Sequence, residues 1–537
     1  MPFRRRLARS LAALALAAFP AMLPVHAGAQ VVYSRCNDAD PETLDAHKTS
    51  VVSEANILRD VSEGLLIHNA RGKVVAGAAE SWTQSPDGKV YTFTLRNNGK
   101  WSNGDPVKAQ DFVFSLRRIM TPETGAKYAT VLYPIKNAEA INKKMDGAPK
   151  IEDLGVRAID DRTLEITLEK PTPYFLELLT HQTGLPVHPG SVQQHDKDFT
   201  KPENWVSNGA YVLKEWVPGS HIQLAKNPNF HDAANVKIDV VRYYPCSDLA
   251  AAARRFQAGE IQSTTDIPAD QVKVLREKLG DQVKVSPYLG TYYLAVNSSK
   301  PPFDDIRVRQ ALSMSIDREF IADQIWSETM LPAYSFVPPG IGNYGEPAYL
   351  SYKSQSPIER EDKAKALLKE AGYGPGLKPL KVEIRYNTTD NNRATVIAIG
   401  NMWKEIGIET AYVNVDAKTH FAHLRDGGDF DVARAGWIGD YSDPQNFLFL
   451  VESQNKGFNY ARYNNPDFDN LMKKAGEELD IEKRAKILFE AESTIMRDLP
   501  IIPVLYYSNR NLISSRLEGY IPNLRGANAT RFMTLKP

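Results

Sequence analysis

The order of hydrophobic and polar residues predicts strands and helices that alternate along the chain. Apolar and polar residues alternate in Lys89–Arg96 and in Thr163–Glu169, which is typical of strands with one buried face. Ala109–Met120 instead repeats its apolar residues at the three- and four-residue spacing of a helix. No tandem repeat or evident linker separates these elements. We therefore expect several α/β domains that interleave in the sequence.

The clearest helix signals surround residues 356–371. Ser356 suits the N-cap, Pro357 suits the first helical position, and Glu359 completes a capping box. Gly372 follows as a stop signal. These signals predict a helix from Ser356 to Ala371.

A further alternating segment, "DVARAGWIGDYSDPQNF" at Asp431–Phe447, ends in a polar turn. Its alternation predicts a strand with two faces, one carrying Arg434, Gly436 and Ile438 and the other carrying Ala435 and Trp437. Because glycine has no side chain, Gly436 would let another backbone come close to this strand. A ligand could then pair with the strand through main-chain hydrogen bonds.

Directly after this strand a single acid, Asp440, lies between Gly439 and Tyr441. Two interpretations are open: the carboxylate either caps the turn before Pro444 or meets a cation of a ligand.

Residues 1–29 have four arginines, a short apolar run broken by two prolines, and a small-residue end. This pattern is typical of a cleavable secretory signal, and a membrane anchor is disfavoured because the run is short. No cysteine follows the cleavage site directly, so we expect an exported protein of the periplasm that is not a lipoprotein. Without the signal, 61 basic residues face 65 acidic ones, a net charge of about −4, which favours neither nucleic acid nor an anionic membrane as partner.

The chain contains two cysteines, Cys36 and Cys246. In an oxidising compartment they form either one disulfide across a long loop or two buried thiols that never meet. The sequence leaves both outcomes open because it does not supply the distance between them.

The motifs of common catalytic centres are missing, including G-x-S-x-G, H-E-x-x-H and the glycine-rich loops that bind phosphates and dinucleotides. His420 and His423 form an H-x-x-H with only Asp426 and Asp429 as close oxygen donors. We interpret them as a solvated helix face rather than half a metal site. We therefore predict no catalytic residue, metal or cofactor, and a binding function is favoured.

Many stretches in the same order resemble the oligopeptide-binding proteins of peptide ABC importers, in solute-binding family 5. These stretches are "LDAHK" (44–48), "EGLL" (63–66), "AESW" (79–82), "KWSNGDPVKAQDFVFS" (100–115), "LGVRAIDDRTLEITLEKPTPYF" (154–175), "NGAYVLKEW" (208–216), "PYLGTYYLAVN" (287–297), "KPPFDDIRVRQALSMSIDR" (300–318) and the segment 431–447. The resemblance runs from Leu44 to the carboxyl end, and it is specific because so many stretches agree together.

The resemblance implies an α/β, two-lobed periplasmic-binding-protein fold that closes like a type II-like clamp, with an extra inserted α/β domain. The family's boundaries place the signal peptide at 1–29, lobe one at 30–63, 186–289 and 508–537, the inserted domain at 64–185 and lobe two at 290–507. Two crossings into lobe two would permit a rigid-body closure around a bound solute.

The resemblance also implies a set of ligand-binding residues. Asp440, in the "DY" that follows "GW", would meet the α-ammonium of a peptide, with Gly436 and Trp437 beside it. Arg425 and Arg434 match family arginines. Further family positions that line the cleft hold Val52, Tyr128, Tyr292, Tyr293 and Tyr507; for the tyrosines, core packing is the competing explanation.

This sequence also departs from the family pattern. A lobe-two disulfide of well-known oligopeptide binders falls on Gly290 and Ile438, so that bond is absent. Positions that offer His and Lys to ligand carboxylates hold Asn392 and Trp326, and an acidic cleft position holds Ala295. Ligand length and identity are therefore the properties most affected.

The function implied is capture of short peptides and their delivery to the permease subunits of an ABC importer, by a monomer that binds no nucleic acid. The family's cationic positions farther from the amine anchor hold Asn392 and Trp326 here. This chain is therefore expected to prefer peptides of two to three residues, or an acidic murein fragment held by Arg434 and Arg425. Two alternatives remain: the same fold binding a murein peptide, a sugar or a metal chelate, and a hydrolase acting in the cleft.

Overall fold

A computed structural model describes residues 30–37, 40–49, 51–374 and 376–536. The predicted secretory signal, at residues 1–29, lies outside the described residues. Within the described ranges, no helix has the length and apolar character needed to cross a membrane.

The region assigned by sequence to lobe one contains a mixed sheet with the strand order β1-β10-β9-β8. Its strands are β1 (Val32–Cys36), β8 (Tyr211–Val217), β9 (His221–Lys226) and β10 (Val240–Tyr244), with the short β17 (Leu517–Glu518) and β18 (Thr534–Leu535) forming a separate pair. Its helices are α1 (Val52–Val61), α5 (Pro189–His195), α6 (Leu249–Gln257) and α7 (Val272–Leu279). β1 runs parallel to β10, and a disulfide joins Cys36, the last residue of β1, to Cys246, two residues after β10. The structure thus decides in favour of the bonded alternative.

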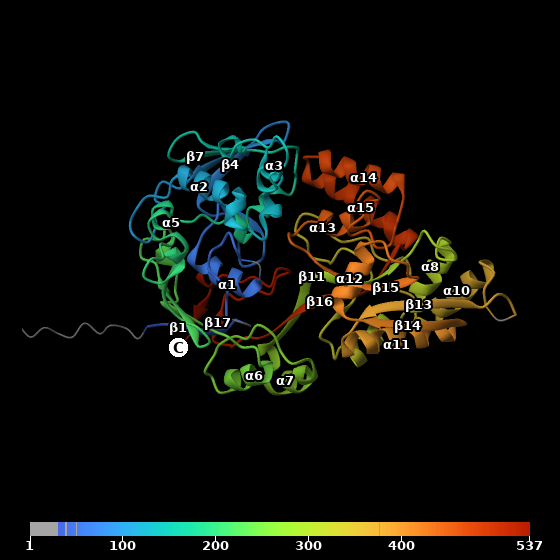
Figure 1. Cartoon of the computed structure of the whole chain (residues 1–537). Helices are drawn as coiled ribbons and strands as arrows, with labels where there is room; N and C mark the ends of the chain where they lie inside the picture. Colours follow the sequence, from blue (N-terminus) through green and yellow to red (C-terminus); the bar gives the residue numbers. More distant parts are fainter. Residues whose placement is uncertain (1–29, 38–39, 50, 375, 537) are drawn as a thin grey trace, which may run out of the picture. The chain divides into compact units, whose positions relative to one another are not determined.

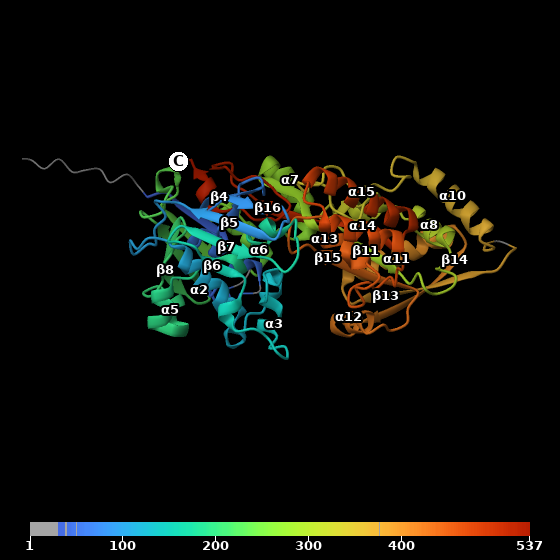
Figure 2. The same cartoon turned by 90° about the horizontal axis from the view of Figure 1, so that it is seen from above.

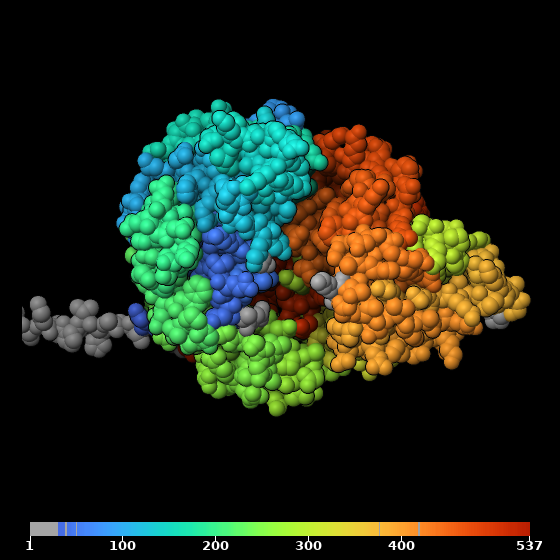
Figure 3. All heavy atoms as spheres, in the orientation of Figure 1, coloured from blue at the N-terminus to red at the C-terminus, as the bar shows by residue number. Residues whose placement is uncertain are grey.

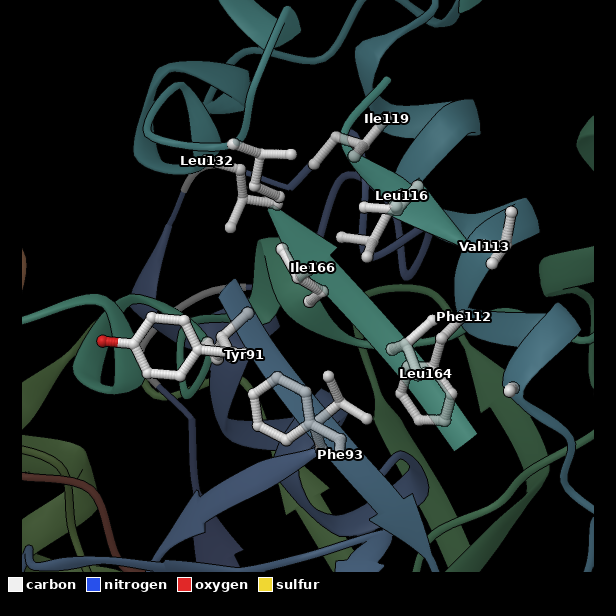
Figure 4. Packing of buried hydrophobic residues seen from close by; sticks show 14 of the residues in the cluster. Tyr91, Phe93, Phe112, Val113, Leu116, Ile119, Leu132, Leu164 and Ile166 are labelled. Carbon is white, nitrogen blue, oxygen red and sulfur yellow. The ribbon is translucent and has the colours of Figure 1, made fainter. Parts of the chain in front are cut away.

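The region assigned to the inserted domain forms a second sheet, with the order β4-β5-β7-β6. Its elements are β2 (Leu66–His68), β3 (Val74–Ala76), β4 (Ala79–Gln84), β5 (Val90–Leu95), α2 (Ala109–Met120), α3 (Ala138–Asn142), β6 (Val156–Ala158), β7 (Thr163–Thr167) and α4 (Phe175–Leu178). The predicted helix and both predicted strands are confirmed here. Every second residue of β5 is buried, so Tyr91, Phe93 and Leu95 face the core. Figure 4 shows how Phe112, Leu116 and Ile119 of α2 complete this core.

The region assigned to lobe two is built on a sheet with the order β12-β16-β11-β15-β13-β14. Its strands are β11 (Val283–Val296), β12 (Leu331–Pro332), β13 (Leu380–Asn387), β14 (Ile408–Val415), β15 (Val432–Ile438) and β16 (Ile501–Leu512). Its helices are α8 (Ile306–Met314), α9 (Arg318–Phe320), α10 (Pro357–Glu370), α11 (Asp390–Glu405), α12 (Ala417–Arg425), α13 (Gln445–Leu448), α14 (Pro466–Glu477) and α15 (Ile481–Asp498). Figures 1 and 2 show α14 and α15 packed side by side.

The predicted capping signals of α10 are confirmed. The Ser356 hydroxyl accepts a hydrogen bond from the Glu359 backbone at 3.3 Å, and the Glu359 carboxylate accepts one from the Ser356 backbone at 2.8 Å. Each side chain thus satisfies a backbone N–H that the first helical turn leaves unpaired.

Two long strands, β11 and β16, connect the first sheet region with the third. They pair antiparallel from Val283 with Leu512 to Ala295 with Ile501, with irregularities between Pro287 and Thr291 and between Tyr292 and Tyr293. The boundaries expected at 289/290 and 507/508 fall within these two strands. The boundaries themselves stay a prediction.

Candidate functional site

The strand β15 has one side paired and the other side partly open. The Asn297 backbone donates to the Asp431 carbonyl, and the Gly439 backbone donates to the Leu289 carbonyl. Because main-chain groups alternate along an antiparallel strand, the odd-numbered residues of β15 face β11 and the even-numbered ones face away. On that far side, β13 pairs only with Val432 and Ala433.

The main-chain groups of Gly436 and Ile438 therefore face an edge where no other strand of the described chain lies. Such an edge can accept an extended peptide through main-chain hydrogen bonds. The structure thus leaves an unpaired edge where the sequence predicted a peptide-binding strand.

The space above Gly436 is filled by side chains rather than left for another backbone. A Cβ at this position would lie 2.5 Å from the Tyr507 hydroxyl and 3.4 Å from Nη2 of Arg434. Glycine is therefore needed here because Tyr507 and Arg434 meet over it, and the expected close approach of a ligand backbone is not the reason on this face of the strand.

Arg434 is a buried cation without an acidic partner in the part of the chain that the structure describes. Its side chain is 9% exposed; Nη1 donates to Asn387 Oδ1 at 3.1 Å and Nη2 donates to the Tyr507 hydroxyl at 2.9 Å. Its guanidinium carbon lies 4.4 Å from the centre of the Tyr292 ring. Aromatic faces and neutral oxygens thus hold a positive charge that remains available to an anion.

Three aromatic residues of the predicted site are packed into cores. Tyr292 is fully buried and makes an edge contact with Trp326, with ring centres 6.0 Å apart. The Trp326 indole donates to the Thr395 hydroxyl at 3.0 Å. Tyr293 points to the other side of the strand and packs against Phe336. Tyr292 thus combines core packing with contact to Arg434, whereas Tyr293 serves a different core.

Asn392 lies behind Arg434. It is 3% exposed, and its amide donates to the Asn387 carbonyl at 3.0 Å, while the Asn387 side chain receives the Arg434 bond. Asn392 therefore supports the backbone of the residue that holds Arg434. The sequence reading missed Asn387 because no local pattern distinguishes it.

The interpretation of His420 as part of a solvated face is wrong. His420 is fully buried, its Nε2 lies 2.8 Å from the Arg434 carbonyl oxygen, and burial lowers its pKa to about 4. The neutral ring donates this hydrogen bond and so satisfies an outward-facing carbonyl of β15. His423 is half-buried and binds the Asp429 carbonyl, so the two histidines do not share a site.

The turn after β15 is held by Asn446. Its side-chain oxygen accepts hydrogen bonds from the Trp437 indole and from the Asp440 backbone, each at 3.0 Å. Asp443 accepts from the Gln445 backbone at 2.9 Å and forms a buried ion pair with Arg484, with distances of 2.7 and 2.8 Å. The turn is thus capped by Asn446 and Asp443.

The Asp440 carboxylate itself makes no hydrogen bond or ion pair with the described residues, so a turn-capping role for its side chain finds no support. Asp440 is exposed, yet neighbouring atoms desolvate it enough to raise its pKa, while the charge of Arg525 acts in the opposite direction. Arg525 donates from Nη1 to the Asp440 carbonyl at 2.7 Å. The arrangement presents a carboxylate that is ready to receive a cation.

Tyr441, next to Asp440, stacks on Tyr174, with ring centres 4.8 Å apart and 4° between the planes. Tyr174 belongs to the region assigned to the inserted domain, so that region contacts the turn that carries Asp440. The sequence reading passed over Tyr174, although it lies in one of the family-like stretches.

Three predicted residues lie apart from Arg434 and the residues that contact it. Val52, 53% exposed, begins α1; Tyr128 packs against His181 with ring centres 5.8 Å apart; and Arg425 is exposed at the end of α12. Arg425 borders an open pocket of about 670 Å³. Among the described residues, no hydrogen bond, ion pair or ring contact joins these three to Arg434.

The positions that depart from the family pattern have clear structural neighbours. Gly290 lies directly opposite Ile438 in the sheet, and a Cβ on Gly290 would lie 2.7 Å from the Ile438 side chain. Ala295 is fully buried in a core. In the ranges that the structure describes, no cluster of three or more His, Cys, Asp or Glu side chains is arranged to hold a metal.

Comparisons with known proteins show similarity in both sequence and fold. The family "Bacterial extracellular solute-binding proteins, family 5 Middle" matches residues 73–459. The chain is 39% identical over 490 residues to the periplasmic oligopeptide-binding protein OppA of Escherichia coli K12, covering 90% of this chain and 89% of that protein. It is also 39% identical over 485 residues to the periplasmic murein peptide-binding protein MppA of the same organism, covering 90% and 88%.

A solved structure described as "MppA Periplasmic Murein Tripeptide Binding Protein, Unliganded Open Form" matches with a TM-score of 0.89 and 37% identity. The match covers 95% of this chain and 98% of that one.

Proposed function

Because this chain belongs to the bacterial extracellular solute-binding proteins of family 5, we propose that it captures short peptides in a closing cleft and delivers them to the permease subunits of an ABC importer. Its fold is the two-lobed α/β fold of that family. We place the protein in the periplasm as a monomer, in line with the predicted secretory signal and with the names of the relatives.

The observation that carries this proposal is the charge pattern along β15. A carboxylate without a partner, Asp440, follows the strand, and a buried arginine without an anion, Arg434, lies within it. The main-chain groups of Gly436 and Ile438 face an open edge between them. A peptide has the complementary features: an ammonium at one end, a carboxylate at the other and a hydrogen-bonding main chain between.

The spacing of these groups favours short ligands. Six residues at about 3.3 Å each separate Arg434 from Asp440, a span of roughly 20 Å between backbone positions. The reach of the arginine and aspartate side chains shortens this span, and Trp326 occupies volume beside Tyr292. We therefore propose peptides of two to three residues, or murein fragments that use Arg425 as a second cationic group.

A thermal-shift screen of a peptide library tests the proposal. Because a ligand that binds only the folded state stabilises it by mass action, some free-amine peptides should raise the melting temperature. If free-amine peptides have no effect while sugars or metal chelates raise it, the peptide assignment is wrong and the alternative ligand class is correct. Release of peptide fragments, followed by chromatography, would instead indicate a hydrolase.

A further inference from the structure

The helix α1 has one partly exposed stripe that ends in an arginine. Seven of its ten residues are buried, and the remaining three, Val52, Asn56 and Arg59, recur at the four- and three-residue spacing of one helix face. Figure 3 shows α1, in blue, reaching the surface on this side of the molecule. Arg59 Nη1 donates to Asn56 Oδ1 at 2.9 Å, and no carboxylate of the described chain lies in ion-pair contact with it.

A second arginine, Arg525, reaches the same region from the segment that follows β17. The Asn523 side chain, 8% exposed, accepts hydrogen bonds from the Arg525 backbone at 3.1 Å and the Ala527 backbone at 3.4 Å, which fixes this segment. From there the guanidinium reaches the Asp440 carbonyl. Arg525, like Arg59, forms no ion pair with a carboxylate of the described residues.

Three acids in or near this part of the fold, Asp60, Glu63 and Glu177, are engaged elsewhere. Asp60 accepts from Thr530 and Tyr243. Glu63 pairs with Arg531 and His231, and Glu177 pairs with His68. These carboxylates are therefore not free to neutralise Arg59 or Arg525.

Arg59 lines a pocket together with Ala527 and Ala529, which follow Arg525 by two and four residues, so the two arginines lie on neighbouring segments. Burial and the charge of Arg525 lower the pKa of Arg59 to about 10. Burial and the same two arginines lower the pKa of His181 to about 3, so this histidine, which packs against Tyr128, stays neutral. Arg525 thus carries a positive charge beside the turn of Asp440, and Arg59 carries another on the partly exposed stripe of α1.

We propose that Arg59 and Arg525 bind a carboxylate that the ligand carries near its amino terminus, so that peptides with an acidic first or second residue are preferred. The inference rests on the proposed function, because an ammonium at Asp440 determines which end of the peptide lies beside Arg525. Without a ligand carboxylate, Arg525 repels that ammonium. With one, the negative ligand carboxylate lies between the positive ammonium and the two positive arginines, so unlike charges are neighbours. Arginine suits this role because its planar fork binds carboxylates in a bidentate way.

Isothermal titration calorimetry with the whole protein tests this inference. The probes are Ala-Glu-Ala against Ala-Gln-Ala, and Glu-Ala-Ala against Gln-Ala-Ala, because each pair differs in one charge and hardly in shape. In at least one pair, the acidic peptide should bind about tenfold more tightly, as expected for a charge pair that the complex partly desolvates. Arg59→Gln should reduce this tenfold preference to between about onefold and threefold, whereas Arg59→Lys should keep part of the preference.

Arg254→Gln is the matched control, since Arg254 is an exposed arginine of α6 whose side chain makes no hydrogen bond or ion pair with the described residues. It should leave the ratio unchanged. Melting curves of each variant verify folding, and Arg525→Gln provides a second, independent removal of charge. The inference is supported if the ratio of affinities for acidic and amide peptides falls in Arg59→Gln and in Arg525→Gln but not in the control.

Equal affinity for the acidic and amide peptides, with binding still dependent on Asp440, would overturn the inference and leave the proposed function standing. Equal losses for both peptides in Arg59→Gln would also overturn it, because the arginine would then only support the structure. If no free-amine peptide binds at all, the proposed function fails and this inference fails with it.

Discussion

The pairing of Asp440 with a ligand ammonium can be tested by removing each partner in turn. Asp440→Asn removes the negative charge and keeps the size of the side chain, and N-acetylation of a peptide removes the positive charge. The Asp440 carboxylate makes no hydrogen bond or ion pair with the described residues, so the variant loses no internal contact. Its melting temperature should therefore equal or slightly exceed that of the parent protein, since a desolvated charge is also removed.

The magnitude follows from the surroundings of Asp440. Two unit charges about 3 Å apart attract by about 5 kcal/mol at an effective dielectric constant of about 20. Lost hydration opposes this attraction, and so does the positive charge of Arg525 beside Asp440. Truncating one partner of a desolvated pair costs about 2 to 5 kcal/mol, and we expect about 2 to 3, or roughly 30- to 140-fold in Kd, because Asp440 is exposed before binding.

The assay is calorimetry on the four combinations of protein and peptide, with the exposed Glu277→Gln as a control that should leave Kd unchanged. The two single losses should not add, because both remove the same interaction. Binding to the parent protein should also weaken as the pH falls through the raised pKa of Asp440, and Asp440→Asn should remove that dependence. Full additivity of the two losses would refute the pairing.

Three further predictions concern the opposite anchor, a buried acid and the disulfide. Arg434→Gln should weaken the binding of free-acid peptides more than that of C-amidated peptides. In a series of alanine peptides from two to five residues, tightest binding at four or five residues would contradict the short-ligand proposal. Burial raises the pKa of Glu492 to about 7 from 4.5, so its contribution to stability is complete below about pH 4.5 and falls by about 3 kcal/mol as the pH rises through 7. Glu492→Gln should remove that slope from urea unfolding measured between pH 4 and 8; an unchanged slope would contradict the assignment. Replacing Cys36 and Cys246 by serine should lower the free energy of unfolding by up to about 5 kcal/mol, given their separation of 210 residues, and an unchanged denaturation midpoint would contradict this.

Local order in the sequence was sufficient to predict several elements. The helix at 109–120 and the cap at Ser356 are read correctly because capping and helical spacing depend on residues within a few positions of one another. The strand of Arg434 is predicted for the same reason, since alternation of side chains is a local property. The family resemblance then indicated the family's binding role, and the site residues that it implies stay a prediction.

The surroundings of these residues depend on the tertiary structure. His420 was interpreted as part of a solvated face because its sequence neighbours offered too few metal ligands. The packing of α12 instead buries it against the Arg434 carbonyl. Tyr292 and Tyr293 are adjacent in sequence and equally suited to a cleft or a core. Their opposite faces of β11 place one beside Arg434 and the other in a different core.

The disulfide and the two unpaired arginines show most clearly what the tertiary structure decides and the sequence does not. The sequence left the pairing of Cys36 and Cys246 open, and the parallel alignment of β1 with β10 decides it. Arg59 and Arg525 carry no motif, and neither is near Asp440 in the sequence. The fold brings Arg525 to the Asp440 carbonyl across 85 residues and adds Arg59 from the first helix. Interactions between charges act through space, so they depend on how distant segments pack together. The local spacing of residues in a sequence does not record that packing.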